Sequence, residues 1–422
     1  MWRKAAAPVA GLIVLAAATA CASSSGGSSS SGGDIVIGGI NALTGASASA
    51  DTDTLHGAEL AAQIIDGKYP GIHLPFASGT GLPNLHGAKI KIDALDTQGS
   101  PETAVSDVST LVQSDHAVGI VGAYSSSETQ AASARAERFG VPFVNGASSA
   151  PSLTQRGLQW FFRVGPTDMT FGEGMFSLLK QETAAGHPVH RIAILHTNDT
   201  YGNGVNRVTK QLATQNGYQV VADESYDKTT SDLTPEILAI RAVHPDVLFD
   251  SSYTNDAILL VKGLNQFHYH PPAVLGYGAG FSDPTFLPTL GPLAKGLMSR
   301  AAWSAEIPNA ASQAVAQLFQ QTYHRPMTEN SARNFTALMT LAMAINNAGS
   351  TDPAKVQHAL ETINVPASDL IMPWAGVRFD NSHQNIEAQG IVQQVQSGSY
   401  RVVYPAGSAV AKVAWPVTAA QG

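Results

Sequence analysis

The chain has 422 residues, 44% of them hydrophobic, which is enough for one large or two medium domains with hydrophobic cores. Its formal net charge of -8 and its lack of a dense Lys/Arg run argue against a nucleic-acid partner, because phosphate binding needs clustered positive charge. A single cysteine excludes an intramolecular disulfide.

The first twenty residues are typical of an export signal. Arg3 and Lys4 precede an apolar stretch that ends in small residues. Cys21 follows directly, in the sequence AATAC, which resembles the lipobox of bacterial lipoproteins, although Ala18 stands where leucine is usual. We therefore expect a lipoprotein signal peptide at 1–20 and lipidation of Cys21. An incidental, unmodified cysteine is the alternative.

A Gly/Ser-rich segment, 21–33, follows the signal and is predicted to be a flexible tether. No later stretch of the sequence approaches the length and apolarity of a membrane-spanning helix. The sequence therefore predicts a protein that is lipid-anchored to the extracytoplasmic face of the bacterial cell membrane and does not cross it.

From residue 34 on, short apolar runs alternate with longer amphipathic stretches, which is the pattern of βαβ units and parallel sheets. The first expected strands are 34–43, 88–96, 117–124 and 141–147, with helices that begin near Thr54, Pro101 and Glu128. After an irregular joint at 163–168, strands are expected at 191–197, 218–226, 246–253 and 273–278, with helices near 202–216, 232–243 and 255–267. Two such series predict an α/β protein with two similar lobes.

The last part of the chain differs, because helices follow one another without strands between them. They are expected at 309–324, 331–349 and 352–363, with Asn309, Ser331 and Asp352 as N-caps. Strands then return around a hairpin turn at Ser397-Gly398, as if the chain crossed back to complete an earlier lobe. The Pro- and Gly-rich segment 68–85 is predicted to be a surface loop.

Motifs for catalysis or metal binding are missing from the sequence. It contains no G-x-S-x-G, H-E-x-x-H, C-x-x-C or Walker sequence, so we expect no enzyme, no cofactor and no metal site. His268 and His270 could in principle ligate a metal, but their place before two prolines is more typical of a surface loop.

Two turns rich in serine follow neighbouring strands of the first series. In open α/β sheets, ligands bind beyond the carboxyl ends of the strands, near helix N-termini. Ser125, with Glu128 three residues later, fits a capping box, so we expect it to be a structural cap. Ser126, and Ser149 in the second turn, have hydroxyls that would suit a carboxylate next to a positive helix terminus.

Several segments in order resemble the type I periplasmic substrate-binding proteins of ABC importers, of the leucine/isoleucine/valine-binding kind. The resemblance runs from about residue 34 to about residue 404 and rests on segments such as IGGINALTGA, IVGAYSSSETQAAS, VPFVNGASSAPSL, WFFRVGPTD and RIAILHTNDTYGNG. It implies two Rossmann-like lobes with parallel sheets flanked by helices, joined by three crossovers. Lobe 1 would comprise 34–167 and 303–374, and lobe 2 would comprise 168–302 and 375–415.

The resemblance also implies a ligand site between the lobes that closes by hinge motion. The residues implied to bind the ligand are Ser126, Ala147, Ser148, Ser149, Tyr201, Tyr253 and Tyr277. Ser126, the backbone of Ala147 and Ser149 are implied to hold its carboxylate. Members that bind α-amino acids carry an acid for the ammonium group where this chain has Gly278, and the nearest acid is Asp283. An aromatic of some members corresponds to Ala50, which implies room for a larger ligand.

These departures put an ordinary branched-chain amino acid in doubt, because an unpaired buried ammonium is costly. The ligand implied is a small carboxylate or amide-like metabolite, aromatic acids included, with amino acids still an option. The function implied is delivery of that ligand, by a monomer, to ABC permease and ATPase subunits. The alternative is a ligand-sensing receptor component built on the same fold.

Overall fold

The computed structural model describes residues 33–416, so the expected signal peptide, Cys21 and most of the tether lie outside the described residues. The first of its two large sheets is entirely parallel, with strand order β2-β1-β3-β4-β5. Its strands are β1 (Ile35–Asn41), β2 (Ile90–Asp96), β3 (Gly119–Gly122), β4 (Phe143–Asn145) and β5 (Phe161–Arg163). They are short, and β3 to β5 are buried throughout, as expected for parallel strands covered on both faces.

The second sheet has the order β14-β13-β10-β9-β8-β6-β7. Its parallel part consists of β6 (Arg191–Thr197), β7 (Gln219–Tyr226), β8 (Val247–Ser251), β9 (Ala273–Gly276) and β10 (Met298–Ala301). The late hairpin, β13 (Ile391–Gln396) and β14 (Ser399–Tyr404), joins β10 in antiparallel fashion. The chain therefore returns to complete an earlier lobe, as the sequence predicted.

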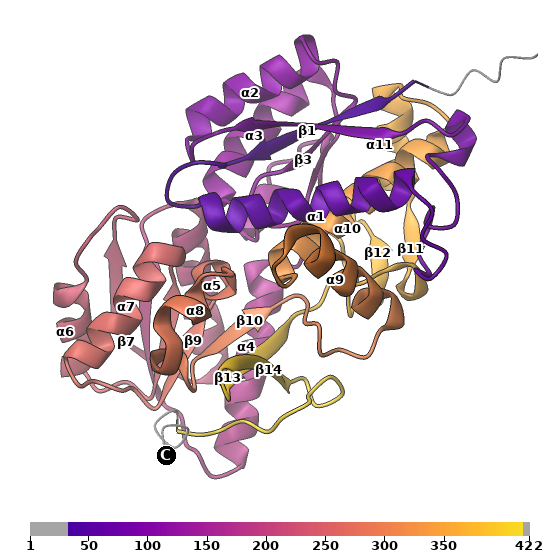
Figure 1. The fold of residues 1–422 in the computed structure, drawn as a ribbon. Coiled ribbons are helices and arrows are strands. Elements are labelled where there is room, and N and C mark those ends of the chain that lie inside the picture. The colour runs from indigo at the N-terminus through magenta and orange to yellow at the C-terminus, as the bar shows by residue number, and fades with distance from the viewer. Residues whose placement is uncertain (1–32, 417–422) are drawn as a thin grey trace, which may run out of the picture. The chain divides into compact units, whose positions relative to one another are not determined.

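Helices flank both sheets (Figure 1). The first series contains α1 (Ala48–Asp66), α2 (Pro101–Gln113) and α3 (Ser126–Phe139). The second contains α4 (Asp168–Ala184), α5 (Thr200–Asn216), α6 (Thr234–Ala242), α7 (Thr254–Gln266) and the short α8 (Phe286–Leu290). Side chains at the strand-to-helix turns cap α3, α4 and α5, because Ser125, Thr167 and Asp199 each accept a bond from a first-turn backbone N–H.

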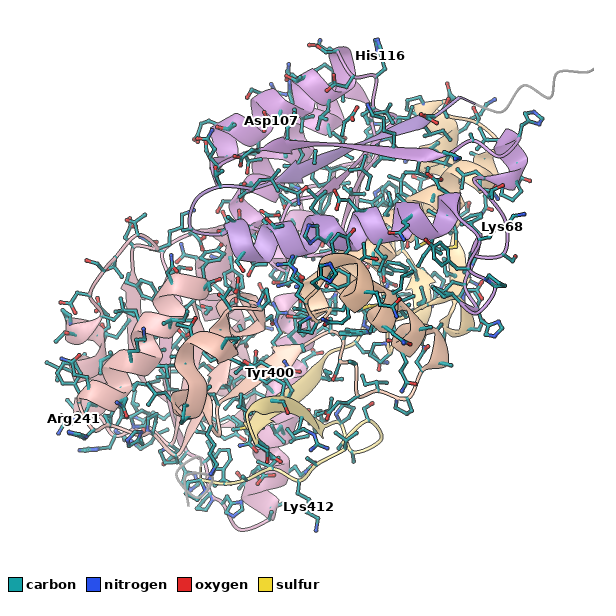
Figure 2. The ribbon with its side chains drawn as sticks, viewed as in Figure 1. Lys68, Asp107, His116, Arg241, Tyr400 and Lys412 are labelled. Carbon is teal, nitrogen blue, oxygen red and sulfur yellow. The ribbon has the colours of Figure 1, made fainter. Side chains whose placement is uncertain are left out.

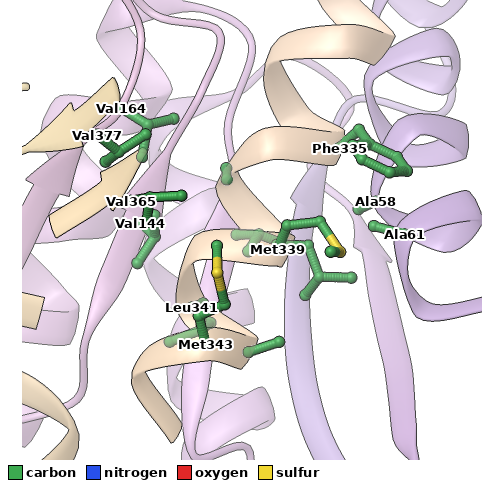
Figure 3. Packing of buried hydrophobic residues seen from close by; sticks show 14 of the residues in the cluster. Ala58, Ala61, Val144, Val164, Phe335, Met339, Leu341, Met343, Val365 and Val377 are labelled. Carbon is green, nitrogen blue, oxygen red and sulfur yellow. The ribbon is translucent and has the colours of Figure 1, made fainter. Parts of the chain in front are cut away.

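The consecutive helices after β10 are α9 (Ala310–Tyr323), α10 (Glu329–Ala348) and α11 (Pro353–Glu361), followed by a small antiparallel pair, β11 (Asn364–Pro366) and β12 (Gly376–Arg378). Every residue of α10 from Glu329 to Ile345 is buried, because the helix packs between α1, the first sheet and α11. Figure 3 shows this core, where Phe335 and Met339 of α10 lie near Ala58 and Ala61 of α1. A helix buried on all sides needs small residues at its closest contacts.

The chain passes between the two sheets three times, after β5, after β10 and before β13. The last passage comes later than the expected boundary at residue 374. Val377, Phe379 and Ala388 pack in the apolar cluster of the first sheet, and only from Ile391 does the chain pair with the second sheet. The α/β architecture with two parallel-stranded sheets and three crossings is thus confirmed. None of the helices within 33–416 is long and apolar enough to span a membrane.

Candidate functional site

A small cavity of about 20 Å³ lies where the carboxyl ends of strands from both sheets meet. Its lining comes from segments far apart in the chain: Tyr124, Ser125, Ser126, Ala147, Ser148, Ser149, Tyr201, Tyr253, Ala279, Arg300 and Arg333. Six of the seven residues implied to bind the ligand are therefore brought together. A space of this size holds about one water molecule, so a larger ligand needs the two sides to separate or their side chains to move.

Larger hollows occur elsewhere in the described part of the chain. One of about 820 Å³ lies along α10 and α11, and another of about 430 Å³ lies between α8, the start of α10 and the β13–β14 hairpin. Size alone would favour them. The small cavity is the better candidate because it lies at the carboxyl ends of parallel strands and is lined by buried polar groups that lack partners.

The first serine turn separates a structural serine from a candidate ligand serine. Ser125 accepts from the backbone N–H of Glu128 at 3.3 Å and donates to the Glu128 carboxylate, which confirms the predicted cap. Ser126 is also buried, and its Oγ accepts from the backbone N–H of Ala150 at 3.4 Å. Ser126 thus links the first turn to the second at the edge of the cavity.

The second turn is fixed mainly by Asn145 and Ser148. The Asn145 amide donates to the carbonyl of Gly122 at 2.7 Å, and its Oδ1 accepts from the backbone N–H of Ser148 at 3.1 Å. The Ser148 hydroxyl lies 3.0 Å from the Ala123 carbonyl oxygen and 3.1 Å from that of Tyr124. Ser148 therefore lines the cavity, but its hydroxyl holds the two turns together.

Ser149 is the serine with the freer hydroxyl. Its backbone carbonyl accepts from the N–H of Asp168 at 2.9 Å, and its side chain faces the Asp168 carboxyl. Burial raises the pKa of Asp168, while the Ser149 hydroxyl and the nearby guanidinium of Arg300 oppose that rise. Ser149 is 2% exposed, so a hydroxyl here would bind a ligand group out of competition with bulk water.

Three tyrosines form the aromatic part of the lining. The rings of Tyr124 and Tyr201 have centroids 6.2 and 5.7 Å from that of Tyr253. The Tyr253 hydroxyl donates to Asp199 at 2.8 Å, and the Tyr201 hydroxyl donates to the carbonyl of Tyr277 at 2.9 Å. Burial raises the pKa of the three lining tyrosines well above its ordinary value, so they act as neutral hydrogen-bonding groups.

Tyr277 is the implied site residue that is not found in the lining. Its side chain is fully buried behind the cavity, where the ring centroid lies 6.0 Å from that of Phe249 and the hydroxyl accepts from Thr209 at 3.0 Å. Only its backbone approaches the site, as the acceptor for Tyr201.

Two fully buried arginines that the sequence analysis did not single out complete the lining. Arg300, from β10, donates through Nη1 to Oε1 of Glu329 at 2.7 Å. Arg333, from α10, donates to the carbonyl of Ala147 at 2.6 Å, and its Nε lies 3.7 Å from Oε2 of Glu329. The sequence held a signal for Arg300, which interrupts the apolar and small-residue segment GLMSRAAW, but not for Arg333, which stands between Asn330 and Asn334.

Gly278, Asp283 and Ala50 were expected to affect the choice of ligand. Gly278 has a φ of +74°, and a Cβ at this position would lie 2.3 Å from Cζ of Arg300. Asp283 is committed to structure, since it accepts from the hydroxyls of Ser49 and Thr254 at 3.1 and 3.0 Å. Ala50 is buried in the apolar cluster that includes Tyr124 and Tyr253, and it is not among the residues that line the cavity.

No group of three or more His, Cys, Asp or Glu side chains is placed to hold a metal ion within 33–416. His268 has a φ of +48° in the turn after α7, and His270 belongs to the edge of a surface groove. The basic side chains labelled in Figure 2, Lys68, Arg241 and Lys412, lie at separate places on the periphery.

With this fold and this site, the chain belongs to the periplasmic binding protein family, whose model matches residues 34–399. Among curated proteins it is 25% identical over 399 residues to Leu/Ile/Val-binding protein homolog 7 of Brucella suis, covering 91% of this chain and 94% of that protein. The predicted resemblance to leucine/isoleucine/valine-binding proteins is therefore confirmed.

Solved structures show the same fold. A leucine-binding protein, LivK, from Thermotoga maritima is 19% identical, with a TM-score of 0.75 over 87% of this chain and 97% of that one. A solute-binding protein of an ABC transporter from R. palustris, in complex with benzoate, is 18% identical, with a TM-score of 0.74 over 90% and 98% of the two chains. At such identities the likeness establishes the two-lobed type I architecture and leaves the ligand open.

Proposed function

We propose that this chain is the lipid-anchored, extracytoplasmic solute-binding protein of an ABC importer, and that it binds a small carboxylate-bearing ligand between its lobes. The observation that carries the proposal is the convergence of Ser126, Ser149, Tyr201 and Tyr253 on one buried cavity from both sheets. Membership of the periplasmic binding protein family supports a binding function, and hence no catalytic one.

Hinge closure is the mechanism that we propose for binding. The lobes would comprise 34–167 with the helical block after β10, and 168–302 with the β13–β14 hairpin. Side-chain bonds join residues of the two lobes: Ser49 to Asp283 at 3.1 Å, and Thr200 to Gln130 at 3.2 Å. Such bonds can break and re-form as the lobes rotate, since water replaces each partner at little net cost.

The ligand class is a small carboxylate, from branched-chain or other amino acids to amides and aromatic acids. The relatives support this range, because LivK is named for leucine and the R. palustris protein was solved with benzoate. Calorimetry with amino acids, organic acids and amides tests it. Binding of a carboxylate compound is the expected result, and a panel without any binder would contradict the proposal.

Transport is favoured over sensing because the matched R. palustris protein is described as part of an ABC transporter. The partners would be a permease and an ATPase. Deletion of the gene that encodes this chain should abolish ligand uptake by intact cells. Normal uptake, together with loss of a ligand-dependent transcriptional response, would instead identify a sensor component.

Ser149→Ala should weaken ligand binding by about 1–3 kcal/mol, because the buried hydroxyl would be lost from a charged carboxylate. Titration calorimetry with the strongest panel ligand measures the change. Ser177→Ala is the matched control, since the Ser177 hydroxyl bonds only within α4, at 2.7 Å from the carbonyl of Glu173. Equal affinities of the two variants would exclude Ser149 from the site.

Cys21→Ser should release the protein from the membrane fraction without altering ligand affinity, because lipidation at Cys21 would supply the anchor. Fractionation followed by immunoblotting measures the distribution, and calorimetry on the released protein checks affinity. Retention of the variant in the membrane would show that anchoring does not depend on this cysteine.

A further inference from the structure

The lining of the cavity presents buried hydrogen-bond donors without partners. Nε of Arg300, Nε of Arg333 and the hydroxyl of Tyr124 are buried and make no hydrogen bond within the protein. The two arginine side chains are 2% and 1% exposed. Arg333 Nε still faces Oε2 of Glu329 at 3.7 Å, so Nε of Arg300 and the Tyr124 hydroxyl are the two groups without a partner. Unpartnered buried polar groups are rare and costly, so two beside one cavity indicate that a ligand supplies acceptors there.

The charges at the cavity are also unequal. Two guanidinium groups line it, and Glu329 is the carboxylate that contacts both. An anionic ligand group would offset the remaining positive charge, whereas a zwitterion would bring an ammonium into the same surroundings. Placing like charges together in a water-excluded site is costly.

Position 278 adds a steric argument. A Cβ there would lie 2.3 Å from Cζ and 2.5 Å from Nη1 of Arg300, so only glycine leaves the guanidinium its place. Arg300 is held there by Glu329 and by the ring of Phe171, whose centroid is 3.9 Å from Cζ. Arg300 of β10 is therefore a fixed cation beside the end of β9 and in the lining of the cavity.

Asp168 is the group that could reverse this conclusion. Its carboxyl is fully buried, and neither carboxyl oxygen has a partner at hydrogen-bond distance. It is not part of the cavity lining, although Ser149, whose side chain faces it, is. Arg163 and Arg300 both act on it electrostatically, so its charge is partly balanced within the protein.

On the basis of the proposed function, we infer that the ligand is a small organic anion without an ammonium group, and that Arg300 and Arg333 determine this specificity. Arg333 holds the Ala147 carbonyl and so stands beside the second serine turn, where the ligand carboxylate would lie. Arg300 also lines the cavity, where it favours a hydrogen-bond acceptor such as an oxo, hydroxyl or second carboxylate oxygen.

Matched ligands test the inference on the unaltered protein. L-leucine, its 2-oxo analogue and its deaminated analogue 4-methylpentanoate share one skeleton, and benzamide has the ring of benzoate with a neutral amide in place of the carboxylate. Calorimetry should show that anions bind at least about tenfold more tightly than the matched zwitterion or amide. Leucine binding as tightly as its 2-oxo analogue would overturn the inference and leave the proposed function standing. Absence of binding across the panel would contradict the proposed function itself.

Substitutions test whether Arg300 and Arg333 cause the preference for anions. Arg300→Gln and Arg333→Gln should each lower affinity for the preferred anion by at least about tenfold, whereas Arg138→Gln, on the exposed end of α3, should leave it unchanged. Far-UV circular dichroism identifies variants that fail to fold. If a variant does not fold, the comparison of matched ligands on the unaltered protein still tests the inference. If leucine binds and Asp168→Asn abolishes its binding, Asp168 holds the ammonium and the inference is wrong.

Discussion

Replacing Glu329 by glutamine should lower the free energy of unfolding by about 3–5 kcal/mol, because it removes the carboxylate that neutralises two buried arginines. The Glu329 side chain is 2% exposed. It accepts from Nη1 of Arg300, the hydroxyl of Ser282 and the backbone N–H of Ala302, at 2.6–2.7 Å. Glutamine keeps the volume, but its amide group would face donors and leave the guanidinium charges unopposed.

The loss should depend on pH. Burial acts to raise the pKa of Glu329, but Arg300, Arg333 and the bonds from Ser282 and Ala302 outweigh it, so the pKa is lowered. A carboxyl whose pKa is lower in the folded state stabilises the protein above its unfolded pKa, about 4.3 for glutamate. That contribution disappears as the pH falls through the folded pKa. The stability difference between wild type and variant should therefore be full at neutral pH and shrink in acid.

Urea denaturation at several pH values measures both effects. Glu361→Gln is the matched control, because the Glu361 side chain is 41% exposed and its removal should change stability by less than about 0.5 kcal/mol. If the Glu329 and Glu361 variants unfold at the same urea concentration, the buried ion pairs do not hold this end of α10. A pH-independent loss would instead indicate a packing defect.

The order of the main elements could be predicted because buried parallel strands produce short apolar runs, and few other structures produce such runs. The elements that were missed carry weaker signals. β5 has only three residues, and α4 contains Gly172 and Gly174, which lower helix propensity. Gly172 lies in close contact with α5, since a Cβ there would lie 2.6 Å from Cδ1 of Leu212 and would displace that side chain.

Helix boundaries were less predictable than helices. Ser331 was expected to be the N-cap of α10, but the cap is Thr328, and Ser331 is the third residue of the helix. The Thr328 hydroxyl accepts from the N–H of Asn330 at 3.1 Å, while the Ser331 hydroxyl accepts from the N–H of Thr328 at 2.9 Å. Two hydroxyl residues three apart form a reciprocal box, and the sequence alone does not say which of them begins the helix.

The site was predicted where it follows directly from strand ends and missed where it depends on tertiary packing. The serine turns sit at fixed places after β3 and β4, so their convergence could be inferred from topology. Arg300 and Arg333 come from β10 and α10, and the sequence does not reveal that these elements meet the serine turns. The two arginines are buried beside Glu329 because β10 and α10 come together in the fold, and this proximity is not visible in the sequence.

Gly57→Ala should destabilise the protein although alanine is the better helix former. α1 crosses α10 at this glycine, and a Cβ there would lie 2.0 Å from the backbone carbonyl oxygen of Ser331. Backbone cannot move aside as a flexible side chain does, so the two helices must separate. Overpacking of this kind costs about 3 kcal/mol. Helix propensity offsets up to about 1 kcal/mol of it, so we expect a net loss of about 2 kcal/mol.

Gly174→Ala is the control for the contact between Gly57 and Ser331. It makes the same chemical change in a helix, at a position with open space around it. No heavy atom lies within 4 Å of a Cβ added to Gly174 of α4, so only the propensity gain of about 0.5–1 kcal/mol remains. Thermal and urea denaturation should therefore move in opposite directions for the two variants. If Gly57→Ala also stabilises, α1 and α10 can part without loss. The buried face of α10, which positions Arg333 and Glu329, would then be less tightly fixed than the packing in Figure 3 indicates.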